Sequence, residues 1–547
     1  MPRHERGLKV TMQSIAGRII LLDGWRRAGL AFLAGLLATF ALAPYDVPLV
    51  GFVSFPILVW LIDGAVGDPG RGLLRRLAPA FGIGWFFGFG YFLGGLWWLG
   101  AAILVDAAEF WWALPFAVLG LPAVLAFYHA VAAALARLLW SEGGGRILAL
   151  AAAFALAEFA RGRLFTGFTW NEIGMMAAPT PLLMQSLSLV GLHGLTLAAI
   201  VVFAAPALLA GSRQGRAAVA ALALVLTLAH LGYGAYGLSR PSPGFVPDVA
   251  LRIVQPNILQ SQKWDAEEAE RIFARHLELT GDRTGESEGG ETLVVWPESA
   301  FPFILTDQPD AIARLSDTLL LGETLLAGAA RAEGERGSER LFYNSLLVIG
   351  EDGTILDARD KVHLVPFGEY LPFQAELESL GISQLTQLPG GFTAGADRSP
   401  VTLASGLSFL SLICYEIIFQ DEIEDFDRSG GRPGFLLNVT NDAWYGRTPG
   451  PHQHARHAQA SAVAFGLPLV RAANTGISFV TDASGRVVAG LDLGETGVVR
   501  SAMPGAGEPS VFSKVRNLPF LLALAAASGV AVALTYFGRR CQRFHGS

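Results

Sequence analysis

Long apolar runs recur through the first 240 residues, and they limit the folds open to this chain more than any other feature. Most of them approach the ~20 residues that an α-helix needs to cross a bilayer. With 52% hydrophobic and 16% charged residues, the composition excludes a purely soluble or disordered protein. We therefore predict about eight transmembrane spans: 28–43, 47–62, 79–105, 111–139, 147–160, 182–210, 217–236 and 518–537. The first, second and fifth of these are the shortest.

The charges between these runs indicate how the chain crosses the membrane. Arginines lie in the N-terminal segment, in the loops after the second, fourth and sixth runs, and after the last run. Because basic loops stay on the cytoplasmic side, both termini are predicted to be cytoplasmic, and the chain emerges outside near Ser239. A cleaved signal peptide is the competing interpretation of the basic N-terminus, but no small-residue cleavage site follows it. The turns after the first and third runs are acidic: Asp46, Asp106 and Glu109.

Residues 244–504 differ in character from the apolar segments on either side. Short β-type runs alternate there with helix-like segments such as 266–280 and 311–321, and Gly- and acid-rich turns separate them. The near-continuous apolarity of these runs predicts a sheet buried on both faces, in an α/β domain with one large core. The chain then divides into a membrane domain (1–238), an α/β domain (244–504) and a C-terminal transmembrane helix (518–537). The β-type runs are VALRIVQ, TLVVW, LLAGAA, SLLVIG, LSFLSLIC, GFLLNVT and GISFVTD.

Cys414 ends one of these apolar runs, FLSLICYEIIF at 409–419. A thiol at the end of a buried strand is held rigidly and can still be reached, which suits a nucleophile. A small core hydrophobe is the alternative interpretation. The second cysteine, Cys541, falls on the cytoplasmic side, so neither a disulfide nor a cysteine zinc site is expected. An unpaired thiol in an outer domain is a liability, and catalysis is the obvious reason to keep one.

Two other segments carry residues that could serve such a thiol. VVWPES places Glu298 after a strand and a proline, where a carboxylate near apolar groups can act as a general base. KVHLVPFGEY places Lys361 and Glu369 on either side of a turn, and a lysine can stabilise an oxyanion. A solvated strand end and a solvated turn are the alternatives for Glu298 and Lys361.

WPES, KVHLVPFGEY and LICYEI together resemble the Glu-Lys-Cys motifs of the nitrilase (carbon-nitrogen hydrolase) superfamily. With QPNILQSQKW and the flanking spans, the chain resembles the membrane-embedded apolipoprotein N-acyltransferase family of that superfamily. NVTNDAWYG and RAANTG are similar to later motifs of the family. The resemblance implies a multi-pass helical domain and an αββα nitrilase-like domain.

The same resemblance implies roles for single residues. Cys414 would be the nucleophile, Glu298 the general base and Lys361 the stabiliser of the oxyanion. Glu369 would orient Lys361 or assist the base. Tyr415 and Glu416 match positions that matter in the family. Trp264 matches a tryptophan that would contact lipid or hold a loop in place.

The implied reaction is acyl transfer from a phospholipid to the α-amino group of an N-terminal diacylglyceryl-cysteine of apolipoproteins, through a Cys thioester. It would take place in the bacterial inner membrane with the α/β domain on the periplasmic face, in a monomer, without a cofactor, a metal or nucleic acid. A membrane-tethered amidase and a non-catalytic membrane scaffold are the alternatives. So many spans argue against the amidase, and the intact trio argues against the scaffold.

Some features depart from the family or are left open. The family usually reads GFPW where this chain has GFTW with Thr169, and its Arg-Ala-x-Glu element is replaced by residues 461–464, SAVA. The second change casts doubt on how a helix packs beside the sheet. Glu158 and Arg161 form either a functional pair or a pair that only stabilises a helix end. Two segments with exposed-looking apolar residues are expected to form lid arms over the site: 301–305 and 371–388.

Overall fold

The computed structural model describes residues 3–68, 70–210, 214–263, 267–284, 290–334, 340–379, 384–385, 391–423 and 431–545. The chain divides into two compact units. The helical unit comprises Met1–Gly100, Trp112–Arg240 and Ser510–Ser547, and the α/β unit comprises Ala101–Trp111 and Pro241–Pro509. Each unit is described separately below.

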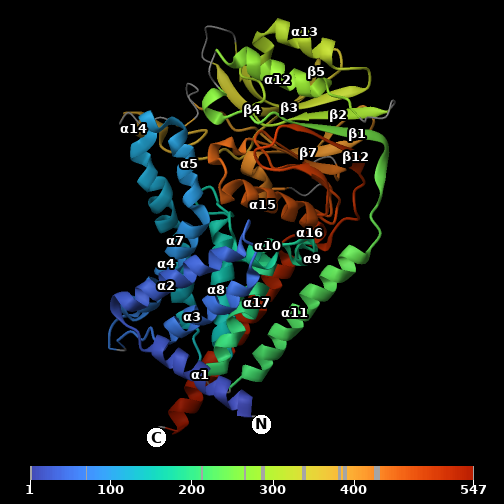
Figure 1. Ribbon diagram of the computed structural model, residues 1–547. Coiled ribbons are helices and arrows are strands. Elements are labelled where there is room, and N and C mark those ends of the chain that lie inside the picture. Colours follow the sequence, from blue (N-terminus) through green and yellow to red (C-terminus); the bar gives the residue numbers. More distant parts are fainter. Residues whose placement is uncertain are drawn as a thin grey trace. The chain divides into compact units, whose positions relative to one another are not determined.

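The helical unit contains both long and short apolar helices (Figure 1). Among the described residues, five helical segments are long and apolar enough to cross a membrane: Leu73–Ala113, Phe116–Leu138, Leu187–Ala210, Arg216–Ser239 and Leu518–Tyr536. They coincide with the longer predicted runs. The first, second and fifth runs form shorter helices of 15, 13 and 17 residues, so the count of about eight is not confirmed. The main helices are α1 (Arg3–Ile20), α2 (Gly24–Ala38), α3 (Gly51–Asp63), α4 (Leu73–Leu96), α7 (Leu121–Leu138), α8 (Gly145–Arg161), α10 (Leu187–Ala204), α11 (Arg216–Ser239) and α17 (Leu518–His545).

The predicted helix over 111–139 is wrong at its start. A 3₁₀ turn (Trp111–Ala113) and a π-helical turn (Phe116–Gly120) precede α7. Pro115 and Pro122 flank the π-helical turn, and neither can donate a backbone hydrogen bond. The regular helix therefore begins only at Leu121.

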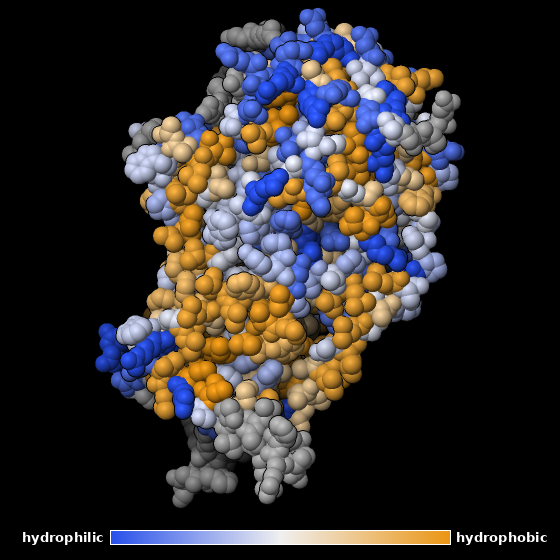
Figure 2. Space-filling view, in the orientation of Figure 1, coloured by the Kyte–Doolittle hydropathy of each residue, from blue (hydrophilic) through white to orange (hydrophobic). Residues whose placement is uncertain are grey.

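Helices α2 and α4 approach each other closely because glycines face the contact. A Cβ atom at Gly35 would lie 1.9 Å from the Phe87 carbonyl oxygen, and one at Gly90 would lie 2.1 Å from that of Phe32. Small residues permit such backbone contact between apolar helices. The outer surface is apolar as well, and Figure 2 shows hydrophobic residues gathered over this unit.

The α/β unit holds two six-stranded sheets within its described residues (Figure 1). Their orders are β12-β1-β2-β3-β4-β5 and β11-β10-β9-β8-β7-β6. Parallel strands β1, β2 and β3 lie within one sheet, and β7, β8 and β9 lie within the other. The strands are β1 (Phe245–Gln255), β2 (Glu291–Trp296), β3 (Glu323–Glu333), β4 (Leu341–Ile349), β5 (Ile355–Asp360), β6 (Val401–Thr402), β7 (Ser408–Ile413), β8 (Phe435–Thr440), β9 (Leu469–Ala473), β10 (Ser478–Thr481), β11 (Val487–Leu491) and β12 (Gly497–Pro504).

The two sheets pack face to face around one core. Ile253, Val295 and Leu326 from the first sheet share a buried cluster with Ile413 and Val439 from the second. Helices α12 (Ala269–Gly281) and α13 (Pro309–Thr318) cover the other face of the first sheet, where a second cluster forms. Helix α15 (Pro449–Phe465) packs on the second sheet beside β9. The layers are therefore αββα, and every predicted β-type run forms a strand.

Candidate active site

Cys414 lies directly after β7, where the chain turns into the 3₁₀ helix η11 (Cys414–Ile418). Its backbone φ is +56°, in the left-handed region that residues other than glycine rarely adopt. Ile413 before it is buried in the core, whereas Cys414 itself is partly exposed. The thiol is thus held at a tight turn and remains reachable.

Glu298 follows β2 and Pro297, and its side chain is buried. Its Oε1 accepts a hydrogen bond from Asn344 Nδ2 at 2.7 Å, and its Oε2 accepts one from the backbone N–H of Asn441 at 2.8 Å. Asn441 follows β8, the neighbour of β7, so strand ends from both sheets meet here. The alternative of a solvated strand end is therefore wrong for Glu298.

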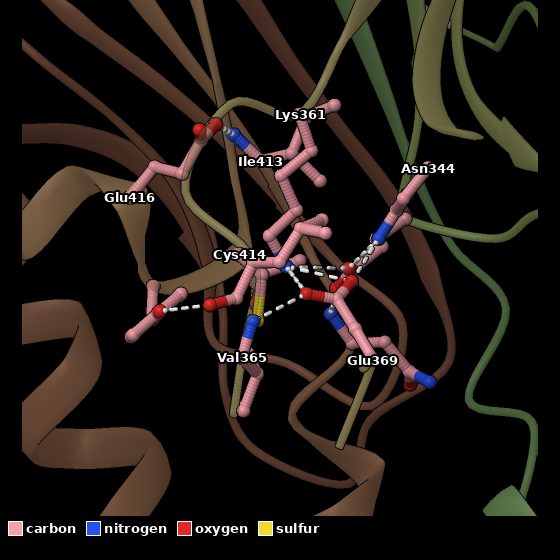
Figure 3. Close-up of polar contacts among 12 residues, drawn as sticks. Asn344, Lys361, Val365, Glu369, Ile413, Cys414 and Glu416 are labelled. Atoms are coloured by element: carbon pink, nitrogen blue, oxygen red, sulfur yellow. Dashed lines mark hydrogen bonds and ion pairs between the residues drawn. The ribbon is translucent and has the colours of Figure 1, made fainter. Parts of the chain in front are cut away.

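Lys361 follows β5 and is 1% exposed, so it is not a solvated turn residue either. Its Nζ lies 2.9 Å from Glu369 Oε2 and 3.7 Å from Glu298 Oε1. Asn344 Nδ2 also donates to Glu369 Oε1 at 2.8 Å, so one amide joins both carboxylates. Figure 3 shows the side chains of Lys361, Asn344 and Glu369 converging beside Cys414.

These charges act on the thiol and on the lysine. Withdrawal from water raises the pKa of Cys414, the Glu298 carboxylate raises it further, and Lys361 opposes both. Burial alone lowers the pKa of Lys361, but the negative charges of Glu369 and Glu298 oppose it, and the pKa lies above its ordinary value. The resting site therefore holds a protonated thiol and a permanent ammonium ion.

Glu416 braces the loop that carries the lysine. Its Oε1 accepts the backbone N–H groups of Val362 and His363 at 2.9 Å each, and its Oε2 accepts that of Ile413 at 2.8 Å. Arg398 Nη2 donates to Oε1 at 2.8 Å. Glu416 therefore ties the segment after Lys361 to the turn at Cys414.

Tyr415 also contacts the loop after Lys361. Its hydroxyl donates to the Leu364 carbonyl at 2.7 Å, and the Lys361 Nζ lies 5.5 Å from its ring centroid. Trp264, the remaining sequence-predicted residue, lies outside the described residues.

Lys263, next to Trp264 in QSQKW, is a site residue that sequence reasoning missed. Its buried Nζ donates to the Glu298 carbonyl at 2.8 Å. Burial lowers its pKa to about 7, although the negative charge of Glu298 opposes the change. The site thus contains a second lysine, which titrates near neutrality.

A row of amides behind Glu298 was also missed. Asn441 Nδ2 donates to Gln260 Oε1 at 2.6 Å, and Asn474 Nδ2 donates to Asn441 Oδ1 at 2.9 Å. This row fixes the peptide whose N–H binds Glu298. Its members lie in NILQ, NVTN and AANT, three of the segments that carry the family resemblance, so the motifs were the available signal.

The departures from the family pattern do not disturb the packing of α15. Ser461 Oγ donates to the Ile417 carbonyl at 2.7 Å, and Ala462, Val463 and Ala464 are buried. Apolar packing and one hydroxyl thus stand where a charge pair was expected. Thr169 is buried in the helical unit.

The expected exposure of the first lid arm is wrong. Phe301 and Leu305 are buried in the core cluster with Phe273, and Phe303 packs against it. In the second segment Phe373 is exposed, whereas Leu371 is buried. Residues 380–383 and 386–390 lie outside the described part of the chain.

The side chains at this site can perform addition and elimination at a carbonyl carbon. They combine a reachable thiol, an adjacent carboxylate and a fixed cation. Across the described ranges, no group of three or more His, Cys, Asp or Glu side chains could hold a metal ion.

Two protein families match the two parts of the chain. Residues 34–205 match the family "Apolipoprotein N-acyltransferase N-terminal domain", and residues 250–504 match the family "Carbon-nitrogen hydrolase". Among solved structures, the chain is similar to a carbon-nitrogen hydrolase from Helicobacter pylori. The two are 15% identical with a TM-score of 0.34, over 46% of this chain and 88% of that one. An amidase from Nesterenkonia is 17% identical with a TM-score of 0.32, over 52% of this chain and 97% of that one.

Curated relatives match nearly the whole chain. The apolipoprotein N-acyltransferase of Brucella suis is 52% identical over 538 residues, which cover 97% of this chain and 99% of that protein. That of Sinorhizobium fredii is 51% identical over 526 residues, which cover 94% and 98%. The chain therefore belongs to the apolipoprotein N-acyltransferase family, whose members are acyltransferases with a carbon-nitrogen hydrolase domain.

Proposed function

We propose that the chain transfers an acyl chain from a phospholipid to the α-amino group of the N-terminal diacylglyceryl-cysteine of an apolipoprotein, through a thioester on Cys414. The observation that carries this proposal is the cluster of Glu298, Lys361 and Glu369 around a partly exposed cysteine. The relatives' name supports an apolipoprotein as the acyl acceptor.

In the first half-reaction, Glu298 takes the thiol proton and the thiolate attacks an ester carbonyl of the phospholipid. Lys361 and the backbone N–H of Tyr415 stabilise the oxyanion. When the intermediate collapses, the ester C–O bond breaks and the lysophospholipid alkoxide receives the proton from Glu298.

In the second half-reaction, the α-amino group of the acceptor attacks the thioester. Glu298 takes the amine proton, an amide bond forms, and the thiolate leaves and recovers a proton. Conversion of a thioester to an amide is strongly favourable, so positioning and one base suffice. Glu369 keeps Lys361 in place through both steps, and Glu416 and Tyr415 hold the Lys361 loop against the Cys414 turn.

The proposal extends to topology. We assign eight spans, with both termini cytoplasmic and the α/β domain on the periplasmic face of the inner membrane, in a monomer. Domain boundaries are placed at 1–238, 244–504 and 518–537. The arginines between the apolar runs and the five long apolar helices support this arrangement. Trp264 is assigned to contact lipid substrate.

The test is intact-protein mass spectrometry of the purified chain incubated with phospholipid alone. We expect a gain of one acyl chain that a diacylated lipopeptide discharges, and no gain in Cys414→Ala. Cys541→Ala serves as the matched control and should acylate normally. An adduct that decays in water and ignores the lipopeptide would establish an amidase-type hydrolase instead. Full transfer by Cys414→Ala would exclude the thioester mechanism.

A further inference from the structure

Four buried polar side chains beside Cys414 take no part in the reaction proposed above. Each is at most 1% exposed, and they come from β8, η12 (Asp442–Tyr445), α15 and β9. They are called the carbonyl clamp here: Asn438, Asp442, His454 and Arg471.

Two members of the carbonyl clamp meet the backbone carbonyl of Cys414. Asn438 Nδ2 donates to this oxygen at 3.0 Å, and His454 Nε2 lies 3.1 Å from it. Asn438 Nδ2 also donates to the Leu412 carbonyl at 2.8 Å. The clamp thus holds the peptide of a residue whose backbone lies in the left-handed region.

The contacts of His454 determine how many protons its ring carries. Nδ1 lies 2.8 Å from Asp442 Oδ1, and Nε2 faces the Cys414 carbonyl, so both ring nitrogens face oxygen acceptors. A neutral imidazole has a single N–H and would turn a lone pair toward one of these oxygens. Only the imidazolium donates to both.

Asp442 is the negative partner that such a ring needs. Arg471 Nη2 donates to its Oδ2 at 2.6 Å. Burial raises the pKa of Asp442, but His454 and Arg471 outweigh it, and the pKa lies below its ordinary value. For His454, burial and Arg471 lower the pKa below its ordinary value, although Asp442 and the Cys414 carbonyl oppose them. The two ring contacts carry the assignment of an imidazolium, because an unprotonated ring nitrogen would face an oxygen lone pair at hydrogen-bond distance.

We propose that His454 is a positioning residue that acts as an imidazolium, holding the Cys414 carbonyl and placing a positive charge behind the thiolate. Within the clamp, the charged groups beside the ring are Asp442 from η12 and Arg471 from β9, so with a protonated His454 the clamp has a net charge of about one positive unit. Asp442 disfavours the Cys414 thiolate, as Glu298 does, whereas the positive charges of Arg471 and of a protonated His454 favour it. The inference rests on the assignment of Cys414 as the nucleophile.

The protonation state is tested by solid-state NMR of the full-length chain in lipid, with ring-¹⁵N histidine, at about pH 7.5. His454→Gln identifies the His454 signals by their loss. We expect both ring nitrogens of His454 to be protonated. A single protonated nitrogen would overturn the proposal, and this measurement requires neither substrate nor acyl transfer.

The effect on the thiol is tested by alkylation of Cys414 with iodoacetamide in a Cys541→Ser background. His454→Gln keeps an N–H that can reach the carbonyl but loses the charge, so we expect alkylation to slow about tenfold, as for a rise of about one unit in the thiol pKa. An unchanged rate would overturn the role of the charge. His276→Gln is the matched control, because His276 is buried in the same unit and its Nδ1 lies 2.8 Å from its own helix carbonyl at Ile272.

The two proposals fail separately. If alkylation of Cys414 slows in His454→Gln but Cys414 forms no acyl adduct with any lipid, the role of His454 is supported and the transferase mechanism is excluded. If Cys414 forms a normal acyl adduct but His454→Gln leaves the alkylation rate unchanged, the transferase mechanism is supported and the role of the His454 charge is excluded.

Discussion

The helical unit and the α/β unit each bury a cluster of charged side chains, but the two clusters differ in their exposure to solvent. In the helical unit, Glu158 accepts from His129 at 2.7 Å and pairs with Arg161, and all three are at most 1% exposed. Arg161 Nη1 also donates to the carbonyls of Phe168 and Trp170. In the α/β unit, two carboxylates and a lysine lie around Cys414, a residue that is partly exposed.

Under the function proposed above, this difference separates a structural cluster from a catalytic one. Both clusters contain ion pairs at hydrogen-bond distance, so pairing alone does not identify a reactive site. Arg161 uses its donors on a carboxylate and on loop carbonyls, which joins the end of α8 to the segment that follows it. Lys361 has carboxylates on one side and a reachable nucleophile nearby. A reachable nucleophile is what the helical cluster lacks among the residues described here.

The largest expected effect comes from removing the cation of the α/β cluster. Lys361→Met should slow acyl-enzyme formation by about 10³-fold, because one oxyanion donor is lost and Glu298 and Glu369 lose their shared cation. The rate is measured by the time course of the mass gain. Lys514→Met, an exposed lysine of the helical unit, is the control and should react normally. If Lys361→Met slows acyl-enzyme formation by less than tenfold, the α/β cluster is not distinguished from the helical cluster by its chemistry.

Removing the cation of the helical cluster should affect stability rather than chemistry. Arg161→Met leaves Glu158 short of its partner and should lower the free energy of unfolding by about 3 kcal/mol. Alkylation of Cys414 should be unchanged. Denaturant unfolding in detergent measures the free energy of unfolding. Arg163→Met is the control, because Arg163 is exposed and contacts the carbonyl and ring of Phe159, in the preceding helix α8. Normal stability with slow alkylation in Arg161→Met would reverse the interpretation.

Lys263 sharpens the comparison through pH. Its pKa falls from 10.5 to about 7 on folding, so between these values the unfolded chain binds a proton that the folded chain lacks. Wild-type stability should therefore rise with pH across this window, by up to about 1.4 kcal/mol per pH unit. Lys263→Met should lack this rise. Melting temperatures at several pH values check it, and parallel curves for the two proteins would contradict it.

The smallest effect is expected from Tyr415→Phe. The variant loses one hydrogen bond from the hydroxyl to the Leu364 carbonyl, and this should cost about 1 kcal/mol of stability. Acyl-enzyme formation should fall only a few-fold if Tyr415 merely steadies the Lys361 loop. A fall comparable to that of Lys361→Met would place the hydroxyl in the reaction itself.

Much of the site was predictable from local sequence. WPES and CYE each follow an apolar run that forms a strand, which predicts a reactive side chain at each of these strand ends. KVH follows β5. The meeting of β2 and β5 with β7 depends on how the two sheets pack. Apolar runs likewise predicted the five long helices and seven of the twelve strands described. The strands β5, β6, β9, β11 and β12 were not predicted. Charged residues interrupt β5, β9 and β12, and β6 and β11 are only two and five residues long.

The sequence by itself determined the class of the protein: an apolar helical unit, an α/β unit, and a cysteine, a glutamate and a lysine at strand ends. Only the tertiary structure decided which polar groups surround them. His129 reaches Glu158 across 29 positions, and Asn441 reaches Glu298 across 143. Strand and helix propensities depend on near neighbours, whereas these contacts depend on how the sheets stack and the helices cross. The partners that set each carboxylate's role therefore appear only in the folded chain.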